Sequence, residues 1–192
     1  MPKFAHLSDI HIGAFRQPEL KELLLEAFDK AVDRCVEERV SFVIMSGDVF
    51  DSNIPDLSSV KRAARKIREA RETGIRFYIV YGSHDFSPNY SSIVDVLESA
   101  GLFSKAERST KTADGLRLEF IRDPSGAAIC GLSGKKVSLD RADYESLDKN
   151  SLSAEEGLKI FVFHGAIDEL KPEELGMIAG MPASYLPEGF DY

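Results

Sequence analysis

Residues 3–13 read KFAHLSDIHIG, an apolar run that leads directly into an aspartate and a histidine two positions apart. The same order, an apolar run before a polar segment, occurs three more times: FVIM before SGDVFD at 42–51, FYIVY before GSHDFS at 77–87, and KIFVF before His164. Runs of this kind predict buried β-strands. Because ligand sites in α/β sheets lie at the carboxyl ends of strands, one sheet edge is predicted to gather these polar side chains.

Segments with helical spacing of apolar residues separate the runs of the first hundred residues. The pattern predicts strands at about 3–8, 41–46 and 75–81, alternating with helices that begin at Pro18, cover about 57–72 and cover about 91–100. Gly101 is suited to end the last of these helices. The βαβαβα order predicts an α/β fold with a mainly parallel sheet covered by helices.

The second half of the chain follows a different pattern. RLEFI (117–121) and AAICGL (127–132) flank a turn sequence with proline and glycine, and together predict a β-hairpin. A short helix is predicted near 140–148, and another in the tail that begins at Lys171. Because no linker divides the chain, residues 1–192 are expected to form a single domain with an antiparallel second half.

The overall composition narrows the class of protein. The chain has 192 residues, a formal net charge of −8 and two cysteines, Cys35 and Cys130. Both cysteines lie in apolar patterns typical of buried positions, which favours a reducing, cytoplasmic compartment. No apolar run approaches the roughly 20 residues of a membrane span. The negative charge does not favour non-specific DNA binding, although bound divalent cations would offset carboxylates at a site.

The residue types at the strand ends suit divalent metal ions. Asp9 and His11 are two positions apart, so both side chains can bind one ion, and Asp48 follows a glycine that permits close backbone approach. A carboxylate has two oxygens and can bridge two cations. Two metals about 3.5–4 Å apart activate water and stabilise the leaving oxygen of a phosphodiester. The mixed oxygen and imidazole set favours Mn²⁺, with Fe, Zn and Mg²⁺ as alternatives.

Each of these signals is weak by itself. Asp-x-His and Gly-Asp pairs are common in ordinary turns, and a single histidine at a strand end, such as His164, is more often structural. Their joint occurrence, in order, on successive strand ends favours a metal site. His6 lies inside the first predicted strand and is interpreted as a core histidine or one that supports the site. Arg16, just beyond SDIHIG, is either a contact for a phosphate backbone or an ordinary surface residue.

SDIHIG, SGDVFD, YGSHD and FHG together resemble the first four motifs of the calcineurin-like metallophosphoesterases. The resemblance implies a layered α/β/β/α sandwich of mixed sheets flanked by helices, with a two-metal site. Within that superfamily, KFAHLSDIHIG and SGDVFDSNIP look most like the Mre-type nuclease of DNA double-strand-break repair, the meiotic recombination eleven or SbcD family.

The resemblance also implies which residues bind metal. Asp9, His11 and Asp48 would hold the first ion, and Asp48 would bridge to a second ion. Ser83 and His164 would be the remaining ligands that this chain provides to the second ion. The cofactor implied is therefore a pair of divalent ions, with Mn²⁺ preferred.

The same resemblance implies that His84 stands near the scissile phosphate and assists the leaving group, with Asp85 helping to orient it. General-acid help of this kind typically contributes about 10²–10⁴-fold. The implied reaction is hydrolysis of DNA phosphodiesters by a metal-activated water, as a 3′–5′ exonuclease and single-strand endonuclease. The alternatives are a general phosphodiesterase or phosphatase for small substrates, and a catalytically weak dimeric scaffold.

Two features depart from the family pattern. Ser83 stands where the family has asparagine, and a hydroxyl is a shorter and weaker ligand than an amide oxygen, so Ser83 is either a ligand or a turn residue. The family's last motif, Gly-His-x-His, has no counterpart after His164. The expectation is a domain that is incomplete at its C-terminus, with weak metal occupancy and low activity in these 192 residues.

The resemblance further implies DNA, an SMC-like Rad ATPase and a second copy of the chain as partners. In the family, the helices after the second and third motifs form a two-fold interface, which corresponds here to about 57–71 and 90–100. The first of these helices has an apolar stripe between basic residues. The second supplies Ile93, Val94, Val96 and Leu97. The alternative is that both stripes belong to the core.

Overall fold

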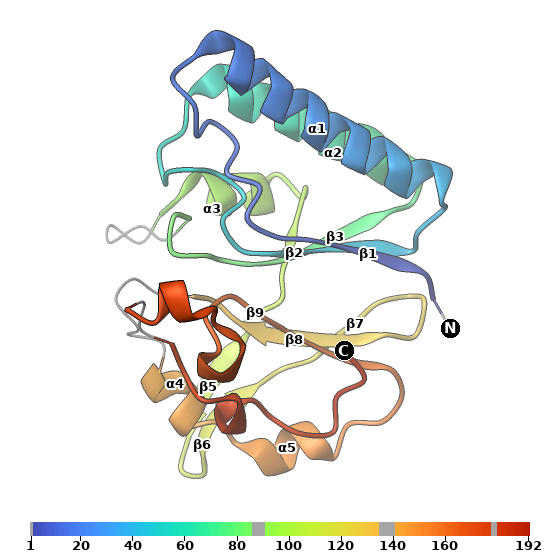
Figure 1. Cartoon of the computed structure of the whole chain (residues 1–192). Helices are drawn as coiled ribbons and strands as arrows, with labels where there is room; N and C mark the ends of the chain where they lie inside the picture. Colours follow the sequence, from blue (N-terminus) through green and yellow to red (C-terminus); the bar gives the residue numbers. More distant parts are fainter. Residues whose placement is uncertain (1, 86–90, 135–140, 178–179) are drawn as a thin grey trace.

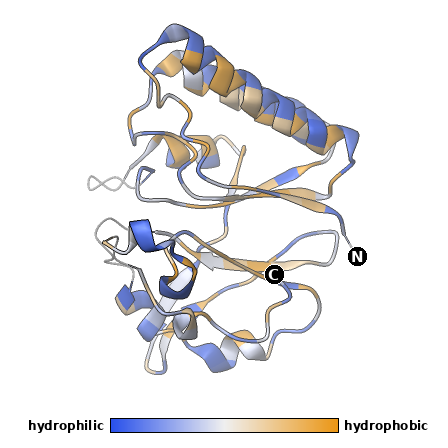
Figure 2. Cartoon of the chain, viewed as in Figure 1, coloured by the Kyte–Doolittle hydropathy of each residue, from blue (hydrophilic) through white to orange (hydrophobic). Residues whose placement is uncertain are grey.

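The computed structural model describes residues 2–85, 91–134, 141–177 and 180–192. Its elements stack in layers (Figure 1): two long helices, a parallel sheet, a second sheet, and a layer of short helices with a β-hairpin. Clusters of apolar side chains fill the spaces between the layers, and Figure 2 shows the strands of both sheets coloured largely hydrophobic. The expected α/β/β/α arrangement is confirmed.

The first sheet consists of four parallel strands, in the order β1 (Phe4–Leu7), β2 (Phe42–Ser46), β3 (Arg76–Val80) and β4 (Ser104–Lys105). Strand β2 lies between two neighbours and is buried along its whole length, which explains its continuous apolar sequence. Helices α1 (Pro18–Glu37) and α2 (Leu57–Glu72) cover the outer face of this sheet (Figure 1). The parallel order predicted for the first half is confirmed.

Helix α2 and helix α3 (Ile93–Ser99) direct their apolar residues to the core. The buried members of these stripes are Val60, Ala63, Ile67, Ala70, Val94 and Leu97. On the other side of α2, Arg62 pairs with Asp29 of α1 at 2.9 Å, so part of the basic face is used within the chain. Most of the stripe considered for a two-fold interface is therefore core, and Leu57 and Val96 are its clearly exposed members.

The second sheet has the order β7 (Ile121–Arg122), β8 (Ala128–Leu132) and β9 (Lys159–Phe163). Strands β7 and β8 form the predicted antiparallel hairpin, but β8 and β9 are parallel, so the expectation of an antiparallel second half is confirmed for β7–β8 and was wrong for β9. The chain between β8 and β9 passes through α4 (Arg141–Glu145) and α5 (Lys149–Ser153). A crossover of this length returns the chain in the same direction, as parallel pairing requires.

Other predicted boundaries in this half also shift. RLEFI is divided, because β6 (Gly115–Leu118) pairs with β5 (Ser109–Thr112) and only Ile121 enters the second sheet. Helix α4 confirms the helix predicted near 140–148, and Gly101 follows the end of α3 with a φ of 76°. In place of one short helix, the described tail has the 3₁₀ turns Glu173–Leu175 and Ala183–Tyr185, and a further 3₁₀ turn, Asp168–Leu170, precedes it. No described helix is both long and apolar enough to cross a membrane.

Contacts between the sheets set the position of β9. At one end, the carboxylate of Asp123 in the β7–β8 turn accepts hydrogen bonds from Arg76 Nε at 2.6 Å and Tyr78 Oη at 2.7 Å. Between the sheets, Ile44 of β2 belongs to the same apolar cluster as Val162 of β9. This packing brings the end of β9 beside the ends of β1, β2 and β3.

Candidate metal centre

The candidate site lies where β1, β2, β3 and β9 end. The segments after these strands place Asp9, His11, Asp48 and His164 around one space. His11 Nε2 lies 4.0 Å from Asp9 Oδ1 and 3.8 Å from Asp48 Oδ2. His164 Nε2 lies 3.4 Å from the same oxygen of Asp48. The four residues do come together, and Asp48 lies between the two histidines.

The backbone at this edge has an unusual conformation. Among the described residues other than glycine, Asp9, His11 and Asp48 have positive φ values of 51°, 49° and 50°, a property shared only with Arg39. Positive φ is uncommon for such residues, and it persists at functional sites where the surrounding structure holds it. Here Asp9 N–H donates to Gly47 O at 3.2 Å and His11 N–H donates to Asp48 O at 2.9 Å.

Two glycines allow the loops to approach closely. A Cβ at Gly47 would lie 2.4 Å from His164 Nδ1, and a Cβ at Gly82 would lie 2.0 Å from Asp48 Oδ1. Both distances are far below van der Waals contact, so a side chain at either position would displace a candidate ligand. The expectation that Gly47 permits close approach at Asp48 is confirmed.

Backbone groups orient two of the candidate donors. Nδ1 of His164 lies 2.9 Å from the carbonyl of Ser46, which can only accept, so Nδ1 carries a proton and Nε2 faces Asp48. Asp48 Oδ1 accepts a hydrogen bond from the N–H of His84 at 2.8 Å. The other oxygen, Oδ2, therefore faces the two imidazoles.

The donor set fits divalent cations. Two donors that each lie about 2.0–2.2 Å from one cation are at most about 4.4 Å apart. The separations of 4.0, 3.8 and 3.4 Å around Asp48 meet this limit. Ser83 is half-buried in the turn after β3, and within the described part of the chain its hydroxyl makes no hydrogen bond to Asp9, Asp48 or His164. Ligation by Ser83 stays a prediction.

The carboxylate of Asp48 controls the charge of His164. Its hydrogen bond and negative charge raise the pKa of His164 to about 9, against the effect of burial. Burial alone would raise the pKa of Asp48, but the hydrogen bonds from His164 and from the N–H of His84 lower it. The metal-free centre therefore holds an ion pair at neutral pH.

This ion pair predicts that the affinity for Mn²⁺ depends on pH. A cation must displace the proton of His164 before Nε2 can bind it, so the affinity for the ion that His164 would hold should rise about 10-fold per pH unit while pH stays below about 9. Calorimetry between pH 6.5 and 8.5 should show about a 100-fold increase in affinity and the release of about one proton from His164. An affinity that stays constant over this range would contradict the assignment.

His84 lies at the rim of the centre. Its side chain is 45% exposed, and its Nδ1 lies 2.7 Å from the backbone carbonyl of Asp51. Its ring meets the ring of His11 edge-on, with 4.9 Å between the centroids. His84 is thus beside the candidate ligands and open to solvent.

Asp85 points away from His84 into the interior. Its buried carboxylate accepts hydrogen bonds from the N–H groups of Val49 (3.3 Å), Phe50 (3.2 Å) and Gly82 (3.1 Å). Burial raises the pKa of Asp85, and these three bonds oppose the rise. Among the described residues the carboxylate of Asp85 joins the loops after β2 and β3, and the carbonyl of Asp51 contacts the ring. A role of Asp85 in orienting His84 would therefore be indirect, through the loop, and stays a prediction.

Asp51 is the residue of this region that the sequence pattern did not single out. Its Oδ1 lies 3.3 Å from His11 Nδ1 and 3.9 Å from His84 Nδ1. The available signal was the second aspartate of SGDVFD, three positions after Asp48. The contact itself depends on how two loops cross, which the sequence does not display.

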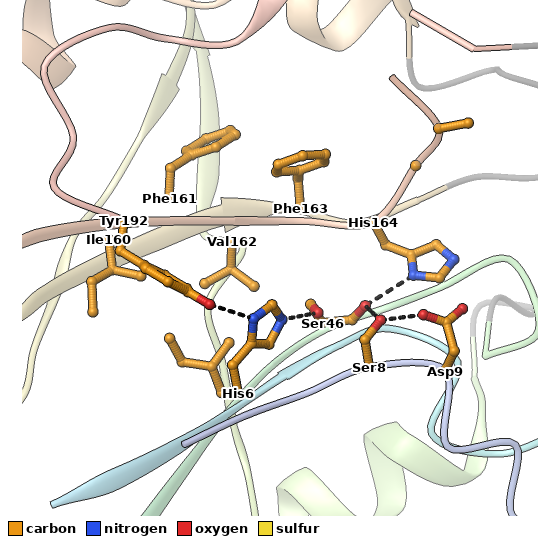
Figure 3. Close-up of a pocket in the computed structure, with 13 residues that line it drawn as sticks. His6, Ser8, Asp9, Ser46, Ile160, Phe161, Val162, Phe163, His164 and Tyr192 are labelled. Carbon is orange, nitrogen blue, oxygen red and sulfur yellow. Dashed lines mark hydrogen bonds between the residues drawn. The ribbon is translucent and has the colours of Figure 1, made fainter. Parts of the chain in front are cut away.

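A pocket of about 700 Å³ opens beside the centre, between the two sheets (Figure 3). Asp9 and His164 belong to its polar lining, next to the candidate ligands. Ile44 of β2 and Val162 of β9 belong to its apolar lining. A substrate or a segment of chain that occupied this pocket would therefore adjoin the metal centre.

His6 lines the same pocket and is exposed. Its Nδ1 lies 2.9 Å from Tyr192 Oη, and its Nε2 is hydrogen-bonded to Ser46 Oγ (Figure 3). The interpretation of His6 as a core histidine was wrong, because its side chain is exposed. Its contact with Ser46, whose carbonyl orients His164, fits the alternative of a supporting residue.

Comparisons with known proteins show what the whole chain is similar to. The family model described as calcineurin-like phosphoesterase matches residues 2–179. The DNA double-strand break repair protein Mre11 of Archaeoglobus fulgidus is 27% identical over 99% of this chain and 44% of its own length. The protein of the same name from Aeropyrum pernix is 31% identical over 100% of this chain and 47% of its own length. The chain thus spans about half the length of these curated relatives.

Proposed function

Since this chain belongs to the calcineurin-like phosphoesterase family, we propose that it is a metal-dependent nuclease that hydrolyses DNA phosphodiesters in double-strand-break repair. The observation that carries the proposal is the convergence of Asp9, His11, Asp48 and His164, with His84 at their rim. The choice of DNA is supported by relatives at 27% and 31% identity that are named for double-strand-break repair.

In this proposal, Asp9, His11 and Asp48 would hold one divalent ion, and Asp48, His164 and Ser83 would hold a second. Such ions, with Mn²⁺ the best match to mixed ligands, supply a nucleophile from water at neutral pH and stabilise charge on the phosphate. Asp48 suits the bridging position because its Oδ2 faces the Nε2 atoms of both histidines.

We assign proton donation to the leaving oxygen to His84. Its Nδ1 is engaged by the carbonyl of Asp51, so Nε2 is the nitrogen left for substrate. Its exposed position at the rim lets it reach a nucleic acid bound from solvent. Asp85 contributes by holding the loops around it, since its carboxylate is occupied by backbone N–H groups.

The proposed activities are 3′–5′ exonuclease and single-strand endonuclease cleavage. Arg16, exposed in the loop before α1, is assigned to the phosphate backbone. We further propose a homodimer through α2 and α3, where Leu57 and Val96 supply exposed apolar surface. An SMC-like Rad ATPase is the proposed protein partner.

Mn²⁺-dependent cleavage of end-labelled linear DNA tests the proposed activity, with bis-p-nitrophenyl phosphate run in parallel and EDTA as the control. Because low activity is expected of residues 1–192, we expect slow cleavage of DNA that requires Mn²⁺ and stops with EDTA. Hydrolysis of the small ester while DNA stays intact would instead favour a general phosphodiesterase, for which the adjoining pocket of about 700 Å³ offers space. A dimer that hydrolyses neither substrate would favour a scaffold.

A further inference from the structure

We propose that Ser8 is a positioning residue that fixes the carboxylate of Asp9 at the metal centre. Its hydroxyl donates a hydrogen bond to Oδ2 of Asp9 and lies 3.3 Å from the carbonyl oxygen of Ser46 (Figure 3). The same carbonyl orients His164 through Nδ1. Ser8 therefore contacts one candidate ligand directly and also the group that orients another. The inference rests on the proposed function, because it concerns a ligand of the proposed metal site.

The backbone sets the place of Ser8. The parallel pairing of β1 with β2 continues past the last residues of the strands, because Asp9 N–H donates to Gly47 O at 3.2 Å. Ser8 and Ser46 come just before this contact in their two segments, so they are neighbours at adjacent strand ends. The hydroxyl of Ser8 reaches both Asp9 and the Ser46 carbonyl because this register holds the two segments together.

The carboxylate of Asp9 has few other contacts that could hold it. Its side chain is 59% exposed, and within the described residues the hydroxyl of Ser8 supplies the one hydrogen bond that its oxygens accept. Oδ1 lies 4.0 Å from Nε2 of His11, which is too far for a hydrogen bond. With Oδ2 held by Ser8, Oδ1 is the oxygen available to a cation shared with His11. Without Ser8, metal binding would have to overcome the conformational entropy of ordering an exposed side chain.

The hydrogen bonds around Ser46 leave the proton of Ser8 to Asp9. The carbonyl of Ser46 already accepts from Nδ1 of His164 at 2.9 Å, and the hydroxyl of Ser46 is engaged by Nε2 of His6. Both neighbours of the Ser8 hydroxyl can only accept, and the charged carboxylate is the stronger acceptor. The single proton of Ser8 is therefore directed to Asp9, while the N–H of His164 is directed to the carbonyl.

The test compares Ser8→Ala and Ser8→Thr with the unchanged chain and with Ser58→Ala. The hydroxyl of Ser58 also donates to an aspartate, Asp56 at the start of α2, so Ser58→Ala removes the same kind of bond away from the site. Calorimetry of the metal-free proteins with Mn²⁺ should show affinity about 10-fold weaker or more for Ser8→Ala, the usual effect of losing a group that orients a ligand. Ser8→Thr keeps the hydroxyl and should stay within a few-fold of the unchanged chain. Ser58→Ala should bind Mn²⁺ normally.

NMR couplings from Cγ of Asp9 to its backbone nitrogen and carbonyl carbon report the χ1 rotamer of Asp9 without metal. The unchanged chain and Ser8→Thr should show one rotamer, and Ser8→Ala should show averaged values. A single Asp9 rotamer in Ser8→Ala, or undiminished Mn²⁺ affinity, would overturn the inference. An equal loss of affinity in Ser8→Ala and Ser8→Thr would overturn it too, because the hydroxyl would not be the cause. Failure of the unchanged chain to bind Mn²⁺ would count against the proposed function alone, since the couplings are measured without metal.

Discussion

Replacement of Asp48 by asparagine is expected to abolish detectable Mn²⁺ binding and phosphodiester hydrolysis while the metal-free chain stays folded. Oδ2 of Asp48 lies 3.8 Å from His11 Nε2 and 3.4 Å from His164 Nε2, so one substitution affects both proposed ions. Loss of a partner outside the ligand shell costs about 10–100-fold in metal affinity, and loss of a bridging ligand should cost about 10³-fold or more. Asparagine has nearly the same shape and keeps an oxygen for the N–H of His84.

Calorimetry with Mn²⁺ and hydrolysis of bis-p-nitrophenyl phosphate measure the two losses in the Asp48→Asn protein, and thermal unfolding checks the fold. Asp29→Asn is the matched control, because Asp29 also forms an ion pair but does so with Arg62 on the helical face. Asp29→Asn should bind Mn²⁺ normally. Asp48→Asn protein that bound Mn²⁺ with undiminished affinity would show that the centre lies elsewhere.

The parallel sheet and the polar strand ends could be predicted from the sequence because both are local patterns. A strand buried on both faces is typically a continuous apolar run, and FVIM of β2 shows it; Asp48 lies two positions after the end of β2. The position of His164 could be suggested by the same pattern. Its approach to within 3.4 Å of Asp48 depends on packing between two sheets, through residues such as Ile44 and Val162.

The roles of the two other aspartates could not be predicted because they depend on loop conformation. Asp85 is adjacent to His84 in sequence, yet its carboxylate turns inward to three backbone N–H groups. Asp51 lies 33 positions from His84 and contacts its ring. The positive φ values at His11 and Asp48 direct these loops, and residue types alone do not reveal them. The apolar stripe of α2 was equally ambiguous, since core and interface select the same spacing.

Replacement of His84 by asparagine should reduce DNA cleavage by about 10²–10⁴-fold, the usual contribution of a general acid, while Mn²⁺ affinity stays within a few-fold. The ring lies at the rim and is half-exposed, and its Nδ1 is used by the carbonyl of Asp51. Asparagine can still donate a hydrogen bond to that carbonyl, but it cannot transfer a proton. The loss should therefore appear in the chemical step and leave metal binding intact. Cleavage of end-labelled DNA and calorimetry with Mn²⁺ measure the two quantities.

The choice of leaving group separates proton donation from other roles of His84. The leaving oxygen of DNA needs a proton, whereas p-nitrophenolate departs without one, so His84→Asn should slow hydrolysis of bis-p-nitrophenyl phosphate far less than cleavage of DNA. A residue that only oriented the phosphate would slow both substrates alike. A metal ligand would lower Mn²⁺ affinity as well. An equal loss on both substrates would therefore show that His84 is not the general acid. A large loss of Mn²⁺ affinity would show that His84 is a metal ligand, like His11 and Asp48.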